Sequence, residues 1–252
     1  MTKKNRSRAI VAAIFCALFL VWVFVLFSYR NTAHEFFPDS IFEIYEVTDA
    51  SMGGSSTAVL DFSDSTLGVE INVRSGVAYP AVGVGFNLRS VNNRPVDYFD
   101  FSKYDSLEIV LATKRMNSVS VRVMTDDPVY TRAGFRETLR PVVYNVSATR
   151  SFESVKLPVT GFRTAVWWIA AMGMEKDDGL THLHRSVLLE ITNGDGVMRG
   201  IPDEINVKKV RAWGINRDFE KAMYAILLLM AVTFVLIETG VLKRRMDENS
   251  RK

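Results

Sequence analysis

The chain reads VEINVR from residue 69 to residue 74, and in this stretch apolar and polar residues alternate without exception. Alternation with a period of two is typical of a β-strand that has one face in a core and the other in water. The pattern recurs at residues 119–123 and, less strictly, at residues 187–192. These stretches therefore predict half-buried strands.

Neighbouring segments extend this pattern along the chain. Residues 107–111 (LEIVL) are apolar on nearly both faces, as expected of a more central strand, and Gly-, Asn-, Asp- and Pro-rich turns separate the runs. Further strands are predicted at residues 41–47, 57–62, 81–88, 140–146, 153–157 and 207–215. The main helix predicted among them is short, near residues 164–174. About ten short strands indicate an all-β domain, a β-sandwich or jelly roll.

Two apolar segments flank this region. Residues 9–29 contain no charged side chain, and residues 222–242 contain one, Glu238. A helix of about 20 residues spans the roughly 30 Å of a bilayer's hydrocarbon core, so both segments predict transmembrane helices. A cleaved signal peptide is the alternative for the first segment. It would have a shorter apolar core and a small-x-small cleavage site, which residues 28–31 (SYRN) do not provide.

Charge predicts the orientation of these helices. Lys3, Lys4, Arg6 and Arg8 precede the first segment, and Lys243, Arg244 and Arg245 directly follow the second. Positive residues are retained in the cytoplasm. The predicted order is a basic cytoplasmic tail (1–8), a transmembrane helix (9–29), an extracytoplasmic β-sandwich (30–221), a second transmembrane helix (222–242) and a second basic tail (243–252).

The composition excludes several classes of function. The chain has 252 residues and a net charge of +3, but residues 31–221 carry −4, which argues against nucleic-acid binding. The single cysteine, Cys16, excludes an intrachain disulfide framework. Gly83-Val84-Gly85 lacks the third glycine and the helix of a dinucleotide site, and there is no phosphate-binding loop. We expect no cofactor, no resident metal and no enzymatic activity.

A series of motifs follows the predicted strands in order. They are DFSKYDSL (100–107), SVRVMT (120–125), VKLP (155–158), Phe162 to Trp167-Trp168, ITNG (191–194), GIPDE (200–204) and VKKVRAWG (207–214). Over residues 55–216 this series resembles the jelly-roll, galactose-binding-like domains related to carbohydrate-binding modules. More narrowly, it is similar to the periplasmic input domain of bacterial membrane diguanylate cyclases and related receptors. The resemblance implies a ligand-binding input domain, whereas only ten residues follow the second helix here.

Four residues are the candidates for ligand contact. Trp167 and Trp168 are adjacent aromatics, and one of them could stack on a sugar ring while the other fills the core. Tyr130 and Arg132 lie in the loop after residues 124–128 and could contact a ligand at the rim.

Other polar residues carry weaker hypotheses. If His182 and His184 lay on a strand, they would share a face and could supply two metal ligands, but a solvated or hydrogen-bonded pair explains them better. The carboxylate pairs Asp126-Asp127 and Asp177-Asp178 are interpreted as solvated turn residues rather than a catalytic pair. Residues 193–196 (NGDG) are interpreted as a hairpin turn.

A stripe of small residues marks the first apolar segment. Ala9, Ala13 and Ala17 are spaced four residues apart, which would let two helices approach closely and favours a homodimer or another membrane protein partner. Chance explains this stripe equally well, because alanine is common in membrane spans.

Together these features predict a sensory module in a bacterial inner membrane. Its periplasmic domain would bind a small molecule or glycan and relay a signal through the bilayer to a partner or an output domain. The alternatives are a structural or assembly subunit of an envelope complex and an envelope glycosidase or esterase.

Overall fold

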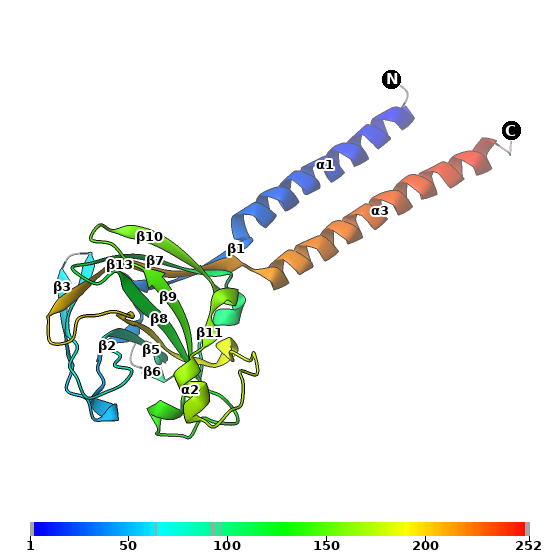
Figure 1. The fold of residues 1–252 in the computed structure, drawn as a ribbon. Helices are drawn as coiled ribbons and strands as arrows, with labels where there is room; N and C mark the ends of the chain where they lie inside the picture. Colours follow the sequence, from blue (N-terminus) through cyan, green and yellow to red (C-terminus); the bar gives the residue numbers. More distant parts are fainter. Residues whose placement is uncertain (1–2, 64, 92–93, 96, 250–252) are drawn as a thin grey trace. The chain divides into compact units, whose positions relative to one another are not determined.

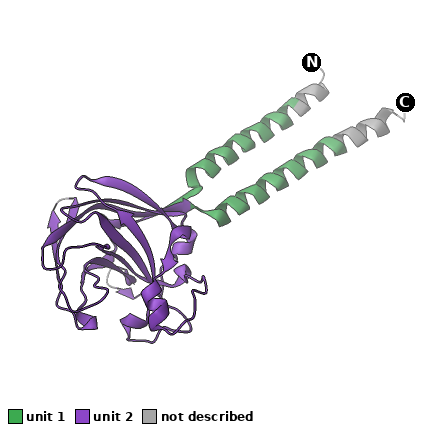
Figure 2. Cartoon of the chain, in the orientation of Figure 1, with its two compact units in different colours: residues 1–32, 215–252 green, residues 33–214 purple. Residues whose placement is uncertain are grey.

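The computed structural model describes residues 3–63, 65–91, 94–95 and 97–249, with only the backbone described for residues 3–8 and 241–249. The chain divides into two compact units (Figure 2). One comprises Met1–Thr32 and Ile215–Lys252 and contains the long helices, and the other is a β-domain formed by Ala33–Gly214.

The β-domain is a sandwich of two sheets (Figure 1). The first sheet has the order β10 (Glu153–Pro158), β7 (Ser106–Thr113), β13 (Asp203–Ile215), β4 (Thr66–Asn72) and β3 (Thr57–Ser63), and β1 (Asn31–Phe37) also pairs with β13. The second sheet has the order β11 (Arg163–Thr164), β9 (Arg140–Ser147), β8 (Ser118–Thr125), β12 (Ser186–Asn193), β5 (Gly83–Val91) and β2 (Phe42–Val47), and β6 (Arg94–Pro95) also pairs with β5. Neighbours in each order are antiparallel. The predicted all-β jelly-roll sandwich is confirmed.

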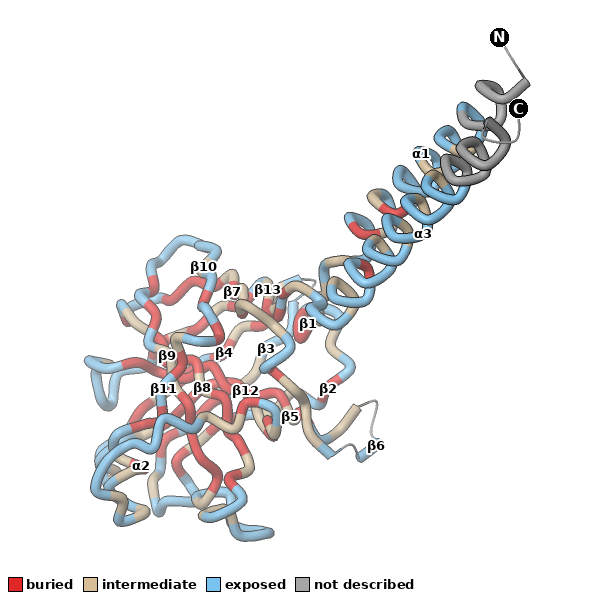
Figure 3. The backbone as a smooth tube through the Cα atoms, turned by 90° about the vertical axis from the view of Figure 1, so that its right-hand side faces the viewer, coloured by how far each residue is buried: buried red, intermediate tan, exposed pale blue. Residues whose placement is uncertain are grey.

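The core lies between the two sheets. On β4, Val69 and Ile71 are fully buried while Glu70 between them is exposed, and on β8 Val121 and Val123 are buried on the same principle. The buried residues follow the strands of both sheets (Figure 3). Burial of such apolar side chains contributes about 1.5–3 kcal/mol each. The alternation seen in the sequence therefore orients each strand.

Aromatic residues close one part of this core. The ring of Phe36 on β1 stacks on those of Phe42 and Phe101, each with centroids 5.5 Å apart, and meets Phe86 edge to face. The strand β1, which carries Phe36, was not among the predicted strands. Its sequence NTAHEFF lacks regular alternation, so its place in the sheet depends on tertiary packing.

The short helix was predicted correctly, whereas the predicted hairpin turn at residues 193–196 was not. The helix α2 (Val166–Ala171) lies within the helix predicted near residues 164–174. The stretch Asn193 to Gly196 is not a hairpin turn, because it follows β12 of the second sheet and leads toward β13 of the first. The chain changes sheets there, and sequence pattern alone does not distinguish the two kinds of connection.

The helical unit contains α1 (Lys3–Tyr29) and α3 (Arg217–Asn249). Stretches of both, Ala9–Tyr29 and Arg217–Gly240, are long and apolar enough to cross a membrane. The helix α3 begins before the span predicted from residue 222. Asn216 accounts for this start, because its Oδ1 accepts a hydrogen bond from the amide of Phe219 at 3.0 Å and caps the helix.

The two helices contact each other near their ends at residues 30 and 216. The indole Nε1 of Trp22 donates to the carbonyl of Met223 at 2.7 Å. Arg30 accepts a hydrogen bond from the Asn216 amide at its carbonyl (2.8 Å) and pairs through Nε with Glu220 (3.1 Å). These contacts join the end of one helix to the beginning of the other.

The stripe of Ala9, Ala13 and Ala17 is exposed in the single chain. It therefore stays available to a second helix from another molecule, and its role stays a prediction. Of the basic tails, residues 1–2 and 250–252 lie outside the described residues. The helices continue through residues 3–8 and 243–249, whose side chains are not described.

Candidate ligand-binding face

The second sheet turns one face to the core and the other outward. Its strand register aligns a row of outward-facing residues: Tyr45, Gly85, Glu190, Arg122, Val143 and Arg163. The next row in the same direction along β5 aligns Gly83, Thr192, Ser120 and Asn145. Cross-strand partners share a face of an antiparallel sheet, so these residues lie on one outward face, and most of their side chains are polar.

Two hollows lie on this surface. The first has a volume of about 690 Å³ and is lined by Tyr45, Asn87 and Arg89 of the sheet and by the loop segment Thr131 to Arg136. The second has a volume of about 480 Å³ and is lined by Arg122, Asn145 and Arg163 of the sheet, by Trp167 of α2 and by Tyr79. Both volumes are in the usual range of ligand sites, about 300–1,000 Å³.

A buried polar group borders the first hollow. Glu190 is 2% exposed, and its Oε1 accepts hydrogen bonds from the Tyr45 hydroxyl (3.0 Å) and from Nη2 of Arg136. Burial, with the nearby charge of Glu190, raises the pKa of Tyr45 far above its ordinary value, so the hydroxyl stays protonated and donates. The contact also requires Gly85, since a Cβ there would lie 2.3 Å from Cζ of the Tyr45 ring. This cluster fixes Arg136 against the sheet.

Aromatic rings border the second hollow. Trp168 is fully buried and anchors α2, and consecutive residues on a helix point about 100° apart, so Trp167 reaches the surface. Trp167 stacks with Tyr79, their ring centroids 6.4 Å apart and their planes inclined by 20°. The segment that carries Tyr79 is fixed by Asn193, whose Oδ1 accepts from the Val82 amide at 2.8 Å and whose Nδ2 donates to the Pro80 carbonyl at 3.3 Å.

The centre of the second hollow is Arg122 on β8. Its Nε is shielded from solvent and has no hydrogen-bond partner among the described residues. Its neighbour in register on β12 is Glu190, whose carboxylate is already bonded to Tyr45 and Arg136. Burial lowers the pKa of the Arg122 guanidinium from its ordinary value. The arrangement leaves the Nε donor of Arg122 without an acceptor among the residues that the structure describes.

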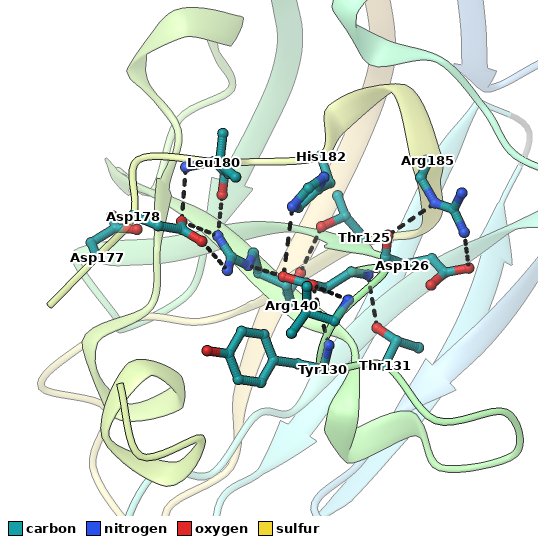
Figure 4. A network of polar contacts seen from close by, with 12 residues as sticks. Thr125, Asp126, Tyr130, Thr131, Arg140, Asp177, Asp178, Leu180, His182 and Arg185 are labelled. Atoms are coloured by element: carbon teal, nitrogen blue, oxygen red, sulfur yellow. Dashed lines mark hydrogen bonds and ion pairs between the residues drawn. The ribbon is translucent and has the colours of Figure 1, made fainter. Parts of the chain in front are cut away.

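A second arginine, Arg140 at the start of β9, has the opposite surroundings (Figure 4). It is solvent-inaccessible, its Nε pairs with Asp127 Oδ2 at 2.8 Å, and its Nη1 and Nη2 pair with the two oxygens of Asp178 at 2.6 and 2.9 Å. Nη1 also donates to the carbonyl of Leu180, and the guanidinium lies over the Trp168 ring at 5.0 Å. Arg140 thus joins the loop after β8 to the loop before β12.

Three of the four loop carboxylates, Asp126, Asp127 and Asp178, pair with arginines and are not simply solvated. Asp177 is an exposed turn residue, as predicted, and its Oδ1 accepts from the Gly179 amide at 3.1 Å. Asp127 is 1% exposed, and its Oδ1 accepts from the amides of Val129 and Tyr130. Asp126 pairs with Arg185 Nη2 at 3.0 Å and accepts from the Tyr98 hydroxyl. The hydrogen bonds from Arg140 lower the pKa of Asp178 to about 2. Arginine partners distant in sequence explain the difference.

The histidines do not have the strand geometry that the metal alternative required, and His184 is exposed while His182 is partly buried. His182 has a left-handed backbone (φ 47°) and precedes a 3₁₀ turn, Leu183–Arg185, so the two histidines do not alternate along a strand. The Nε2 of His182 lies 3.7 Å from Asp127 Oδ2. Among the described residues, no three His, Cys, Asp or Glu side chains are grouped as a metal site would require.

The four predicted contact residues fall in three different surroundings. Trp167 lines the second hollow and Arg132 lines the first. Trp168 is buried beneath Arg140, and Tyr130 meets its ring edge to face at 5.6 Å. These positions leave Trp167 and Arg132 on the ligand-binding face and give Tyr130 and Trp168 packing contacts.

The sequence did not single out Arg122, Tyr79 or Glu190. Alternation places Arg122 on the outward face of its strand, and this was the available signal. Which residues lie beside it depends on strand order and register, which a single sequence does not specify. Tyr79 lies in a turn-rich segment whose position depends on Asn193, more than 100 residues later.

Comparison with known proteins gives matches among solved structures only. No family model and no curated protein matches the chain. The family 11 carbohydrate-binding module of Clostridium thermocellum, in complex with a β-1,3-1,4-mixed-linked tetrasaccharide, matches at 10% identity and a TM-score of 0.48 over 74% of this chain and 96% of the module. The family 11 module of the C. thermocellum cellulase Lic26A-Cel5E matches at 9% identity and a TM-score of 0.47, over 73% and 94%. A family 30 carbohydrate-binding module matches at 17% identity and 0.35, over 72% and 98%. At these values the similarity assigns no ligand to this chain.

Proposed function

We propose that this chain is a membrane-anchored module that binds a glycan on the outward face of its second sheet. The β-domain would lie on the periplasmic side of a bacterial inner membrane, with both termini in the cytoplasm. The apolar helices and the basic residues flanking them support this topology.

The stacked pair of Trp167 and Tyr79 at the edge of the second hollow carries the proposal. A sugar ring has an apolar face of C–H groups and an edge of hydroxyls. Aromatic rings bind the apolar face, while side chains such as Asn145 and Arg122 in the same hollow can bind hydroxyls. A hollow that offers both surfaces suits a carbohydrate better than a purely apolar molecule.

The same face supports binding rather than catalysis. Glycoside hydrolysis needs two carboxyl groups at a defined separation, one of them free to transfer a proton. Glu190, the buried carboxylate of the aligned row, is bonded to Arg136 and Tyr45 through Oε1. These contacts hold the carboxylate in the wall of the site.

The way in which the domain joins the helices supports the proposal of a sensory role. The strands β1 and β13 pair with each other, and each is separated from its helix by a single residue, Arg30 or Asn216. A ligand that prefers one arrangement of the domain could therefore bias the helix pair. A partner protein or separate output domain would receive the signal. Assembly of an envelope complex is the alternative.

Glycan binding is tested with the full chain in lipid nanodiscs. Soluble tetrasaccharides of glucose, galactose, mannose, glucuronic acid and galacturonic acid are titrated calorimetrically. We expect at least one to bind, and Trp167→Ala to weaken that binding by about tenfold or more, since an aromatic anchor at an interface contributes more than about 1–2 kcal/mol. Trp213→Ala is the matched control, because Trp213 is 37% exposed on the other sheet. Absence of binding by all five sugars, or equal loss in both variants, would reject the proposal.

The relay is tested on the same samples. In a Cys16→Ser background, Phe15 and Phe234, whose rings meet at 4.9 Å across the two helices, are replaced by cysteines. We expect the bound sugar to change the rate of crosslinking by a short thiol-reactive reagent. An unchanged rate with saturating sugar would favour anchoring or assembly over sensing.

A further inference from the structure

We infer that the second hollow binds a sugar bearing a carboxylate, and that Arg122 is the residue that pairs with it. The inference rests on the proposed glycan-binding function and specifies the class of sugar. The group in question is the Arg122 guanidinium, whose Nε has no hydrogen-bond partner among the described residues.

The first argument is the unused donor. Nε of Arg122 is shielded from solvent and has no hydrogen-bond partner at any residue that the structure describes. A buried donor without an acceptor costs free energy, and a buried charge costs more. Because protein interiors rarely leave such groups unmatched, an arginine of this kind facing a hollow points to an acceptor supplied from outside.

The second argument is that the nearest protein carboxylate is occupied. Glu190 is in register with Arg122, so it is the natural partner across the strands. Its Oε1 is bonded to Arg136 and Tyr45 instead. Arg136, from a loop of the first hollow, thus takes the pairing that Arg122 would otherwise make, and Arg122 remains available.

The third argument is the charge of the lining. Besides Arg122, the second hollow is lined by Arg163, Arg199 and one acid, Asp195. Arg163 donates to the carbonyls of Thr160 and Phe162, and Arg199 donates to that of Ala78. Backbone carbonyls do not neutralise a guanidinium, so three cations face one carboxylate and the hollow favours an anion.

The chemistry of the ligand follows from these groups. The planar guanidinium fork matches a carboxylate, which can accept two parallel hydrogen bonds. A uronic acid carries this group on a pyranose ring whose face can stack on Trp167 or Tyr79. The second hollow therefore offers a guanidinium for the carboxylate and an aromatic ring for the pyranose ring of such a sugar.

The test compares acids with their methyl esters. Tetrasaccharides of galacturonic and glucuronic acid, the corresponding methyl esters and inorganic phosphate are titrated into the full chain in nanodiscs. The ester preserves the sugar and removes the charge. We expect an acid to bind about tenfold or more tightly than its ester, as a charge-assisted pair predicts. Phosphate alone should bind weakly, because it lacks the ring.

Two variants assign the effect to Arg122. Arg122→Gln keeps hydrogen-bonding capacity and removes the charge, so we expect it to lower the affinity for the acid to that of the ester. Arg115→Gln removes an exposed charge from the turn between β7 and β8 and serves as the control. Thermal unfolding of each variant checks that the domain is folded.

The outcomes separate this inference from the proposed function. Equal affinity for acid and ester, or an unchanged acid preference in Arg122→Gln, overturns the inference while glycan binding stands. Phosphate binding as tight as that of the acids would identify a free-anion site and also overturn it. If no sugar of either kind binds, the proposed function itself fails.

Discussion

Arg122 and Arg140 lie on neighbouring strands of the same sheet, but their guanidinium groups have different surroundings. Arg140 is in register with Thr125 on the inward-facing side, whereas Arg122 shares the outward row with Glu190. Arg140 pairs with two carboxylates, a carbonyl and an aromatic ring, whereas the shielded Nε of Arg122 has no hydrogen-bond partner in the described part of the chain. The comparison shows that an arginine whose donors are satisfied within the protein holds loops in place, whereas an arginine with an unsatisfied donor is a candidate for ligand binding.

The largest expected effect is the loss of the paired arginine. Arg140→Met would leave Asp127 buried without its ion pair and would release the loop that carries Asp178. Breaking one partner of a buried ion pair costs about 3–5 kcal/mol, so we expect the free energy of unfolding to fall by that amount. Urea denaturation of the β-domain within the full chain, followed by tryptophan fluorescence, measures it. A loss below about 1 kcal/mol, comparable to an exposed pair, would remove the distinction drawn here.

The second prediction has the opposite sign. Arg122→Met removes a partly buried charge that has no protein acceptor, so we expect the ligand-free chain to be unchanged or more stable by about 1 kcal/mol. The same denaturation experiment measures this change. Destabilisation as large as that of Arg140→Met would mean that Arg122 is a structural residue, and the contrast would be broken.

The smallest expected effect is the pH dependence of stability that comes from Asp178, one of the partners of Arg140. The pKa of Asp178 is held at about 2, below its ordinary value, by the hydrogen bonds from Arg140. A carboxyl with a lowered folded-state pKa adds stability that is present above its ordinary pKa and is lost as the pH falls toward 2. Because Asp178 is 35% exposed, solvent screens much of this contribution.

The measurement is the melting temperature between pH 5 and pH 2 for the wild type and Asp178→Asn. We expect the wild type to lose more of its melting temperature over this interval, and the two curves to converge at low pH. Parallel curves would show that the pair of Arg140 and Asp178 does not contribute to stability.

The fold was largely predictable because burial imposes a period of two. Residues 69–74 and 119–123 show this period, and residues 69–72 and 119–123 lie in strands with the predicted faces inward. The short helix α2 was predicted too, but which member of the tryptophan pair is buried was left open by the sequence. The strand β1 was not predicted, since its burial depends on aromatic partners from distant segments.

The candidate site was only partly predictable, because strand pairing and register bring together residues that are far apart in the sequence. Trp167 could be selected as a large aromatic next to another, but its partner Tyr79 is 88 positions away. Asp127 resembled a turn residue because its partner, Arg140, lies beyond an irregular loop. Arg122 appears in sequence as an ordinary outward-facing residue. Its significance depends on which carboxylate Arg136 occupies, and no local pattern carries that information.

The carbonyl of Arg30 and the amide of Asn216 are only 2.8 Å apart, so the 185 residues between them leave and return at one point. The β-domain is in this respect an insert: a turn of a few residues could replace it and still connect α1 to α3. A hairpin of two apolar helices could therefore acquire, exchange or lose such a domain without redesign of the helices.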